Sequence, residues 1–514
     1  MKKRPNFLQR LARKILPTEK VIVRSYTGAG VGRLFTDWQA AISTGDSETR
    51  SDLPTLRARC RDLERNSSFG RRIYQAIENN VLGSEGIKFQ AKILNLDGTF
   101  DTMATDIIEG GFSEWGTAKN CAVSGDLTWR AIQKLVLRSQ SRDGGFLIRK
   151  IKGAQAGNRF NFALQPIEID HLDIQYNDQF ANGNVVRMGV EFSQYNRVVA
   201  YWLLSRHPGD WFTPHYLRGP GAADYRMRID ASEIIHYFNR ERATQSVGVP
   251  DLSACLQLLH NLDEYSKAEL IAARASAAKG GYFTSTAGDE FPGQIENENT
   301  SRQATLSKFE PGSFDELPPG MEFKEYNPTH PNQVFPEYVR AMLRELAAGS
   351  GFSYMTITGD LSEANYSSMR SGALQEQENF KMRQTHLIEN FCIPVFEAWL
   401  EMALLSGALN PLPFSKFAKF NRPLFHGRGW PWVDPAKDAN ARLIAINGGL
   451  ETRASLLAQD GRDFEETLKQ LAYEKKTADA YGLTFAKDPV TEKEIALAGK
   501  NNVDGKNSGQ DSSP

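Results

Sequence analysis

The chain of 514 residues is long enough for about two to four domains, and its 40% hydrophobic content predicts that most of it folds around buried cores. With 61 basic and 62 acidic residues its net charge is −1, which argues against a protein that coats nucleic acid with its whole surface but permits one that lets DNA slide past. No stretch reaches the roughly 18 apolar residues of a membrane span, so we expect no membrane partner. The four cysteines lie far apart without a C-x-x-C pair, which argues against a zinc ribbon and indicates assembly in a reducing cytoplasm.

Residues 1–34 are predicted to form a basic arm. The first 33 residues carry nine Lys or Arg and a single acid, Glu19. Apolar residues between Phe7 and Leu16 recur at helical spacing until Pro17 ends the pattern, and they do not form the continuous run of a signal peptide. An arm that docks on a neighbouring subunit is the favoured interpretation, and contact with nucleic acid or a scaffold protein is the alternative.

Residues 35–250 are predicted to form an α+β body. Helical periodicity covers most of its first half, and β-branched and aromatic runs between turn residues predict strands in its second half. Helices are expected to begin at Leu53, Phe69 and Thr128. The expected strands are 145–151, 160–164, 185–192, 198–204 and 234–238, with a hairpin turn at Asn182-Gly-Asn184.

Residues 251–280 are predicted to form one long helix, for which Asp251 is the expected N-cap. Its second half is rich in alanine, and small side chains let helices approach closely. Packing against identical neighbours in a ring is therefore expected, with the core of a single chain as the alternative; the residues concerned are Ala268, Ala272 and Ala275. A second helix is predicted within 333–349, and the turn-rich residues 281–332 between the two form a small head on a two-helix stem.

Residues 350–364 are predicted to be a flexible loop of small polar residues without Lys or Arg. A very long helix is expected to follow over about 365–406, with a kink at Pro394. More helices are predicted within 436–499. Residues 500–514 have the composition of a disordered tail.

Catalytic motifs are missing from the sequence. It contains no P-loop, no H-E-x-x-H and no G-x-S-x-G, so we expect neither an enzyme nor a bound cofactor or metal. Glu168, Asp170 and His171 could suggest a metal cluster, but an ordinary surface position of the histidine is favoured. His236 is expected to be a hydrogen-bonded histidine near a core strand. The segment Trp430-Pro-Trp432 is expected to clamp the packing rather than stack on a base.

Several segments, in order along the chain, resemble the portal proteins of lambda-type tailed bacteriophages. They are Gln165-Pro-Ile-Glu-Ile-Asp-His-Leu172, Arg242-x-x-Gln-x-x-Gly-Val-Pro250, Thr358-Gly-Asp-x-Ser-x-x-Asn-Tyr-Ser-Ser-x-Arg370, Trp432-Val-Asp-Pro435 and Asn447-Gly-Gly-Leu-Glu-Thr452. The similarity extends over nearly the whole chain. One departure is Ser246-Val247, where the family often has a basic residue, so no phosphate contact is assigned there.

The resemblance implies an α+β, mainly α, portal fold whose regions surround a central channel. Residues 35–250 and 365–435 would then form the wing, 251–280 and 333–349 the stem, and 281–332 the clip. Residues 350–364 would be the tunnel loop and 436–499 the crown.

The resemblance also implies a function. Members form a ring of twelve copies at one capsid vertex, through which double-stranded DNA is packaged and later ejected. The partners implied are the terminase large subunit, the head–tail connector, and capsid and scaffold proteins, in a virion assembled in the bacterial host cytoplasm. The channel residues expected in the tunnel loop are Gly351, Ser353, Tyr354, Thr356, Thr358, Asp360 and Glu363. Another structural head–tail joining protein, and a hydrolase built from distant residues, remain as alternatives.

Overall fold

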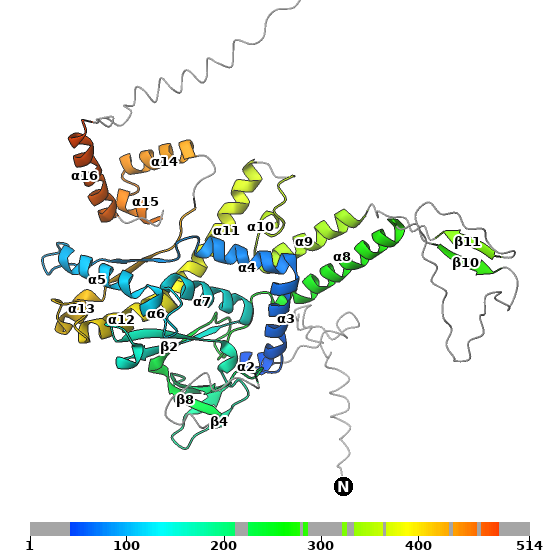
Figure 1. Cartoon of the computed structure of the whole chain (residues 1–514), viewed down its shortest axis with the longest axis horizontal. Helices are drawn as coiled ribbons and strands as arrows, with labels where there is room; N and C mark the ends of the chain where they lie inside the picture. The colour runs from blue at the N-terminus through cyan, green and yellow to red at the C-terminus, as the bar shows by residue number, and fades with distance from the viewer. Residues whose placement is uncertain are drawn as a thin grey trace, which may run out of the picture.

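The computed structural model describes residues 42–210, 225–277, 281–285, 321–325, 334–362, 366–430, 435–459 and 464–482. Figure 1 shows a body of helices and sheets from which two long helices run out to one side. The predicted basic arm, most of the predicted head, Glu363, Trp432 and the predicted tail lie outside the described residues. Within the ranges given, no helix combines the length and the apolar character needed to cross a membrane.

Helices form the first part of the body, close to where the sequence pattern predicts them. They are α2 (Gly45–Thr49), α3 (Leu53–Asn66), α4 (Ser68–Val81), α5 (Thr102–Trp115), α6 (Ala118–Cys121) and α7 (Trp129–Asp143). Local signals set their ends: the Thr128 hydroxyl accepts a hydrogen bond from the Ala131 amide at the start of α7. Gly144 ends the same helix with φ of 84°, a conformation that costs glycine little.

Two antiparallel sheets follow. The first has the order β3-β2-β9, with β2 (Phe146–Lys152) pairing both β3 (Phe162–Ile167) and β9 (Ile234–Tyr237). The second has the order β4-β5-β6-β7-β8. Its strands are β4 (Asp178–Gln179), β5 (Val185–Arg187), β6 (Val190–Phe192), β7 (Val198–Leu204) and β8 (Arg226–Asp230).

The single strand predicted over 185–192 is wrong, because the chain turns back on itself in its middle. Met188 and Gly189 both have positive φ, 48° and 77°, and β5 then pairs with β6 in a tight hairpin. The predicted turn at 182–184 is confirmed: Gly183 has φ of 83° and the Phe180 amide donates to the Asn184 carbonyl.

Two long helices, α8 (Leu256–Ala277) and α9 (Phe335–Ser350), lie side by side and carry the hairpin β10 (Gly281–Ser285) and β11 (Met321–Glu325) at their far end (Figure 1). Aromatic contacts join the helices, since the Tyr265 ring lies 5.4 Å from Phe335 and 5.2 Å from Tyr338. The expected N-cap is wrong: Asp251 precedes a short 3-10 turn, Ser253–Cys255, and α8 begins only after it.

The predicted long helix is nearly continuous. It consists of α11 (Tyr366–Leu387), a π turn (Ile388–Cys392) and α12 (Ile393–Leu405). Pro394 directly follows the π turn inside this nearly continuous helix, and because an interior proline lacks an amide hydrogen and clashes with the preceding turn, the irregularity lies just before it. The remaining elements are α10 (Tyr354–Thr358), α13 (Phe417–Phe420), α14 (Pro435–Asn447), α15 (Arg453–Gln459) and α16 (Phe464–Ala480), and a ribbon in which β12 (Pro423–His426) pairs with β1 (Lys88–Ala91).

The main core gathers around α12. Trp399 and Phe396 are fully buried there, and Trp399 contacts Trp115 and Phe112 from α5. A second core lies under the five-stranded sheet and includes Leu203 and Val190. The four cysteines are buried, unpaired thiols in these interiors.

Candidate channel segment and stem

The segment between α9 and α11 contains a helix that the sequence analysis did not predict. Gly351 ends α9 with φ of 75°, and α10 then runs from Tyr354 until Gly359, with φ of 74°, ends it. The Ser353 hydroxyl caps α10 by accepting from the Thr356 amide at 3.1 Å. A serine N-cap before an apolar pair and a glycine after it are recognisable signals, so the helix could have been found.

Glu376 on α11 holds this segment in place. Its carboxylate accepts hydrogen bonds from the Ser353 amide at 3.1 Å and from the Thr356 hydroxyl at 2.8 Å. Phe352 and Ile357 are buried on either side of these contacts. The first half of the predicted loop is therefore packed against the body, and Ser353 and Thr356 are turned towards α11.

Two arginines from other helices approach the segment, although its own sequence has no cation. The Arg72 side chain on α4 donates to the Thr356 carbonyl at 3.0 Å. The pKa of Asp360 is lowered, first by hydrogen bonds from the Ser362 amide and hydroxyl and then by the charge of Arg340 on α9. Asp360 is thus held ionised in a local turn.

The most exposed described part of the segment follows α10. Leu361 is 57% exposed and Ser362 is exposed, whereas Tyr354 and Thr358 are half-buried and bonded to each other through the Tyr354 carbonyl. Whether the seven residues named from the sequence line a channel stays a prediction.

The far half of α8 carries exposed apolar side chains beside its alanines. Ala268 is exposed and Ala272 is half-buried, while the side chain of Ala275 lies outside the described part. Leu270 and Ile271 are 58% and 65% exposed, and the sequence analysis overlooked them. Their signal in the sequence is an apolar pair that interrupts the polar and small residues of this half of the helix.

At the base of this helix pair, Asp251 ties three elements together. Its carboxylate accepts from Arg383 on α11 at 2.6 Å and from the Gln140 side chain on α7 at 3.2 Å. Its amide donates to the Ser141 carbonyl at 2.9 Å. The residue predicted to cap α8 therefore fixes the start of the stem to the body.

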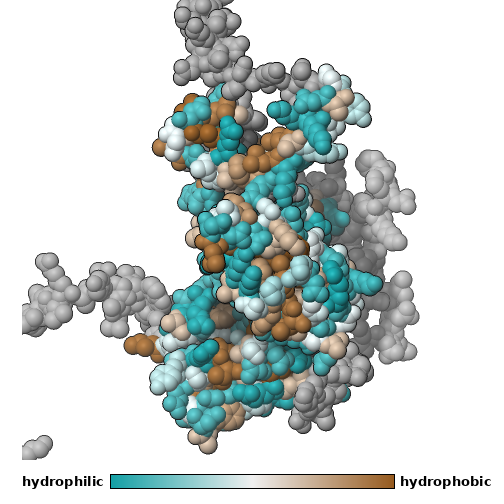
Figure 2. Space-filling view, turned by 90° about the vertical axis from the view of Figure 1, so that its left-hand side faces the viewer, coloured by the Kyte–Doolittle hydropathy of each residue, from teal (hydrophilic) through white to brown (hydrophobic). Residues whose placement is uncertain are grey.

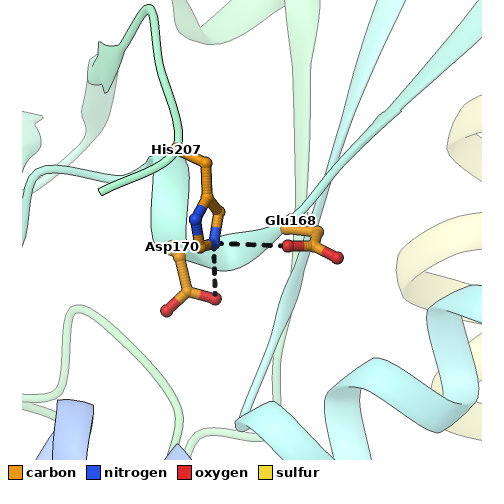
Figure 3. Close-up of side chains that lie close together, drawn as sticks. All are labelled: Glu168, Asp170 and His207. Atoms are coloured by element: carbon orange, nitrogen blue, oxygen red, sulfur yellow. Dashed lines mark ion pairs between the residues drawn. The ribbon is translucent and has the colours of Figure 1, made fainter. Parts of the chain in front are cut away.

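In the described part of the chain, three side chains that could bind a metal ion lie close together (Figure 3). They are Glu168, Asp170 and His207. His207 Nε2 lies 3.4 Å from Glu168 and 3.8 Å from Asp170. The sequence pattern grouped the two acids with His171, whereas the histidine beside them is His207. His171 is not on the surface: it is buried, and its Nδ1 bonds to the Leu204 carbonyl at 2.8 Å.

The hydrogen bonds around this group argue against a metal ion. The Gly209 amide donates to His207 Nδ1 at 3.0 Å, so the neutral ring carries its proton on Nε2, the atom that a metal would need. Asp170 already pairs with Arg57 and Arg61. Burial opposes ionisation of Asp170, but these two charges outweigh it and lower the pKa of the carboxyl. Asp170 and the two arginines form an ion-pair network that joins α3 to the 3-10 turn after β3.

Of the predictions for His236 and Trp430, the first is wrong and the second is confirmed. His236 packs on Phe238 with ring centroids 4.4 Å apart, but its buried Nε2 has no hydrogen-bond partner among the described residues, so the hydrogen bond expected there is wrong. Burial lowers the pKa of His236 to about 3, so the ring is neutral. Trp430 stacks on Phe380 and donates to Asn80 at 3.3 Å, which confirms its packing role.

Comparison with known proteins gives the family. The profile described as "Phage portal protein, lambda family" matches residues 31–384. The probable portal protein of Halomonas phage phiHAP-1 is 33% identical over 88% of this chain and 86% of its own length. The portal protein of Escherichia phage N15 is 18% identical over 91% of this chain and 93% of its own, and portal protein B of Escherichia phage lambda is 26% identical over 28% of each. Among solved structures, a chain from the neck of a native gene transfer agent particle, computed with C12 symmetry, matches 83% of this chain and 97% of its own at 13% identity, with a TM-score of 0.40. From the profile and the 33% identical relative, the chain belongs to the lambda family of phage portal proteins.

Proposed function

We propose that copies of this chain form a ring at one vertex of a phage capsid, and that the hole of the ring is the channel through which viral DNA is packaged and ejected. Membership of the lambda portal family, which rests on residues 31–384 and on a relative matched over most of its length, carries this proposal. The protein is then a structural part of the virion, and we propose no enzymatic step for it.

The stem supports a ring of identical subunits. Leu270 and Ile271 on α8, Val334 just before α9, and Tyr338 on α9 are between 50% and 65% exposed in the single chain. A neighbouring copy that packs on this apolar face removes it from water. A head-to-tail contact between identical chains closes into a ring when its rotation allows, and the resemblance to portal proteins points to twelve copies.

The channel function is assigned to the segment after α10. The Glu376 contacts hold Ser353 and Thr356 against α11, so the residues free to approach DNA begin at Asp360. An ionised Asp360 and the neutral Leu361 and Ser362 offer phosphates no attractive charge. The segment guides DNA sterically and lets it slide.

The hairpin β10–β11 is the proposed docking region for partners. It lies at the end of α8 and α9 that is farthest from the body (Figure 1), and binding sites are often carried by such projecting segments. Terminase during packaging and the head–tail connector afterwards are the proposed partners there. Capsid and scaffold proteins are proposed to contact the body.

Negative-stain images of the purified chain test the ring, and rings with a central hole are expected. A sample that contains only monomers at the concentrations of assembly contradicts the proposal. Shortening the segment between β10 and β11 tests docking separately, since rings should persist while terminase binding is lost. A shortened chain that no longer folds would show that the segment belongs to the core.

A further inference from the structure

An open groove of about 1200 Å³ lies between the loop after β1, α13 and the start of β12. Figure 1 places α13 on the side of the body opposite to α8 and α9, so the groove is separate from the stem. Its walls combine cations with leucines: Lys92, Leu94, Leu96, Lys416, Arg422 and Leu424. We call this site the Lys92–Arg422 groove.

Two cations lie opposite each other on the β1–β12 ribbon that lines this groove. Ala91 of β1 is opposite Pro423 of β12, and the Lys92 amide donates to the Arg422 carbonyl at 3.2 Å. Lys92 and Arg422 are therefore direct cross-strand neighbours on one face. Like charges in this arrangement destabilise a strand pair. Neither cation has an ion-pair partner among the residues that the structure describes.

The groove holds more positive charge than its own acids neutralise. Lys416 is exposed and, within the described ranges, also has no ion-pair partner. Lys419 differs, because Asp101 accepts from it at 2.5 Å and Asn95 at 2.9 Å. Among the described lining residues the one acid is Asp97, whose Oδ1 accepts from the Thr99 amide and hydroxyl. Its single negative charge can offset only one of the three cations Lys92, Lys416 and Arg422. An anion in the groove would relieve the repulsion between Lys92 and Arg422.

The exposed leucines of the groove favour an acidic protein segment over a nucleic acid as the bound anion. Leu94 is 43% exposed, Leu424 is 39% exposed, and the side chain of Leu96 lies fully in solvent. Figure 2, which views this side of the molecule, shows hydrophobic patches set among hydrophilic ones. A nucleic acid backbone would neutralise the cations but leave these leucines in water, whereas a protein segment with both carboxylates and apolar side chains covers both.

We propose that the Lys92–Arg422 groove is a docking site for a short acidic segment of a partner protein, in which carboxylates alternate with apolar side chains. A carboxylate of the segment lies between Lys92 and Arg422, and its apolar side chains cover Leu94, Leu96 and Leu424. The site is separate from the stem and from the channel segment, so it goes beyond ring formation and DNA passage.

Selection from a display library of random short peptides on the purified full-length chain tests the proposal. Peptides rich in Glu or Asp with intervening Leu or Ile are expected to be enriched. The selected peptide should bind at least about tenfold more weakly to the Lys92→Glu, Arg422→Glu double variant. The matched control is Lys119→Glu with Arg197→Glu, two exposed cations outside the groove, and it should bind like the parent chain.

A single Lys92→Glu variant separates binding from folding. It replaces the cross-strand repulsion with attraction, so its melting temperature should equal or exceed that of the parent while peptide binding falls. Equal enrichment on the parent chain and the double variant overturns the proposal, as does enrichment of sequences without acids. A labelled short DNA duplex is measured in parallel: binding of the duplex that depends on Lys92 and Arg422, without peptide binding, overturns it in favour of a nucleic-acid site.

Discussion

The helices α12 and α8 are both rich in apolar residues, but they use them differently. On α12, Val395, Phe396 and Trp399 are fully buried within the chain. On α8, Leu259 and Leu262 are fully buried, whereas Leu270 and Ile271, about two to three turns further along, are mostly exposed. Helix α12 completes the core of its own subunit. Helix α8 begins in that core, but its second half presents an apolar surface that we propose a neighbouring copy covers. The difference predicts which substitutions unfold a subunit and which only prevent assembly.

The largest effect on subunit stability is expected for Trp399→Ala. Removing this fully buried indole from the contacts with Trp115 and Phe112 should lower the free energy of unfolding by about 3–5 kcal/mol. Leu405→Ala, at a 56% exposed position on the same helix, is the control and should change it by less than about 0.5 kcal/mol. Urea unfolding of both variants measures the difference; equal losses would contradict the assignment of α12 to the core.

A smaller loss is expected for Asp251→Asn at the junction between the two regions. The variant weakens the hydrogen bond from Arg383, whose side chain is 25% exposed, and should cost about 1–3 kcal/mol. Glu264→Gln, in an exposed pair with Lys267 on α8, is the control and should unfold like the parent chain. If both variants unfold at the same urea concentration, Asp251 does not anchor the stem.

The ion pairs of the body also predict a pH dependence. Arg57 and Arg61 hold the pKa of Asp170 below its ordinary value, so its contribution is present above the unfolded-state pKa of about 3.9 and is lost as the pH falls through the folded-state pKa. Asp170→Asn should therefore lower stability at neutral pH, by about 1 kcal/mol, and the gap between parent and variant should close below about pH 4. A gap that is constant with pH would show that the charge of Asp170 is not the cause.

Substitutions on the exposed half of α8 should leave the subunit stable. Leu270→Ser with Ile271→Ser should change the free energy of unfolding by less than about 0.5 kcal/mol but prevent ring formation in negative-stain images. Ala272→Phe should overpack the same contact by about 1–3 kcal/mol at each interface. Tyr195→Ser, a 92% exposed position in a turn of the five-stranded sheet, is the control that should still form rings. Normal rings from the α8 variants would place the interface elsewhere.

The smallest effect on stability is expected for Ser362→Lys in the channel segment. One lysine in every subunit places a ring of positive charge near the DNA and should slow packaging at low salt, with partial recovery as added salt screens the charge. Ser362→Gln is the neutral control of comparable bulk. Ser353→Lys and Thr356→Lys are poorer tests, because both positions contact Glu376 and the lysines would disturb the docking of α10. Packaging that is unchanged at low salt would mean that Ser362 does not face DNA.

Much of the fold follows from local sequence signals. The starts of α4 and α7 were predictable because Ser67 and Thr128 supply N-caps, and the end of α7 because Gly144 accepts a left-handed conformation. The split of β5 from β6 was not predicted, since Met188 adopts a positive φ that methionine rarely has. Helix α10 was not predicted because its five residues are too few to show a helical repeat of apolar positions, so only the caps at Ser353 and Gly359 mark it.

Contacts between side chains that lie far apart in the chain could not be predicted from the sequence. The acidic pair at 168–170 was visible, but the choice between His171 and His207 depends on how β7 returns towards the first sheet. The opposition of Lys92 and Arg422 could not be foreseen either, because β1 and β12 pair across most of the chain: Gln90 and His426 bond to each other although 336 residues separate them. A single sequence contains no local signal for such pairs.

The π turn at Ile388–Cys392 has a consequence for insertions and deletions in this family member. Each residue of an α-helix advances about 100° around the axis, and a π turn takes up one residue more than an α turn. Without that extra residue, the buried positions after the turn, such as Val395 and Trp399, would point about 100° away from the line of Phe380 and Leu387 before it. Deleting one residue within the π turn would make the hydrogen bonds regular, but it would also rotate α12 about 100° out of its core. The extra residue of the π turn therefore keeps the buried residues of α11 and α12 on the same side of the long helix.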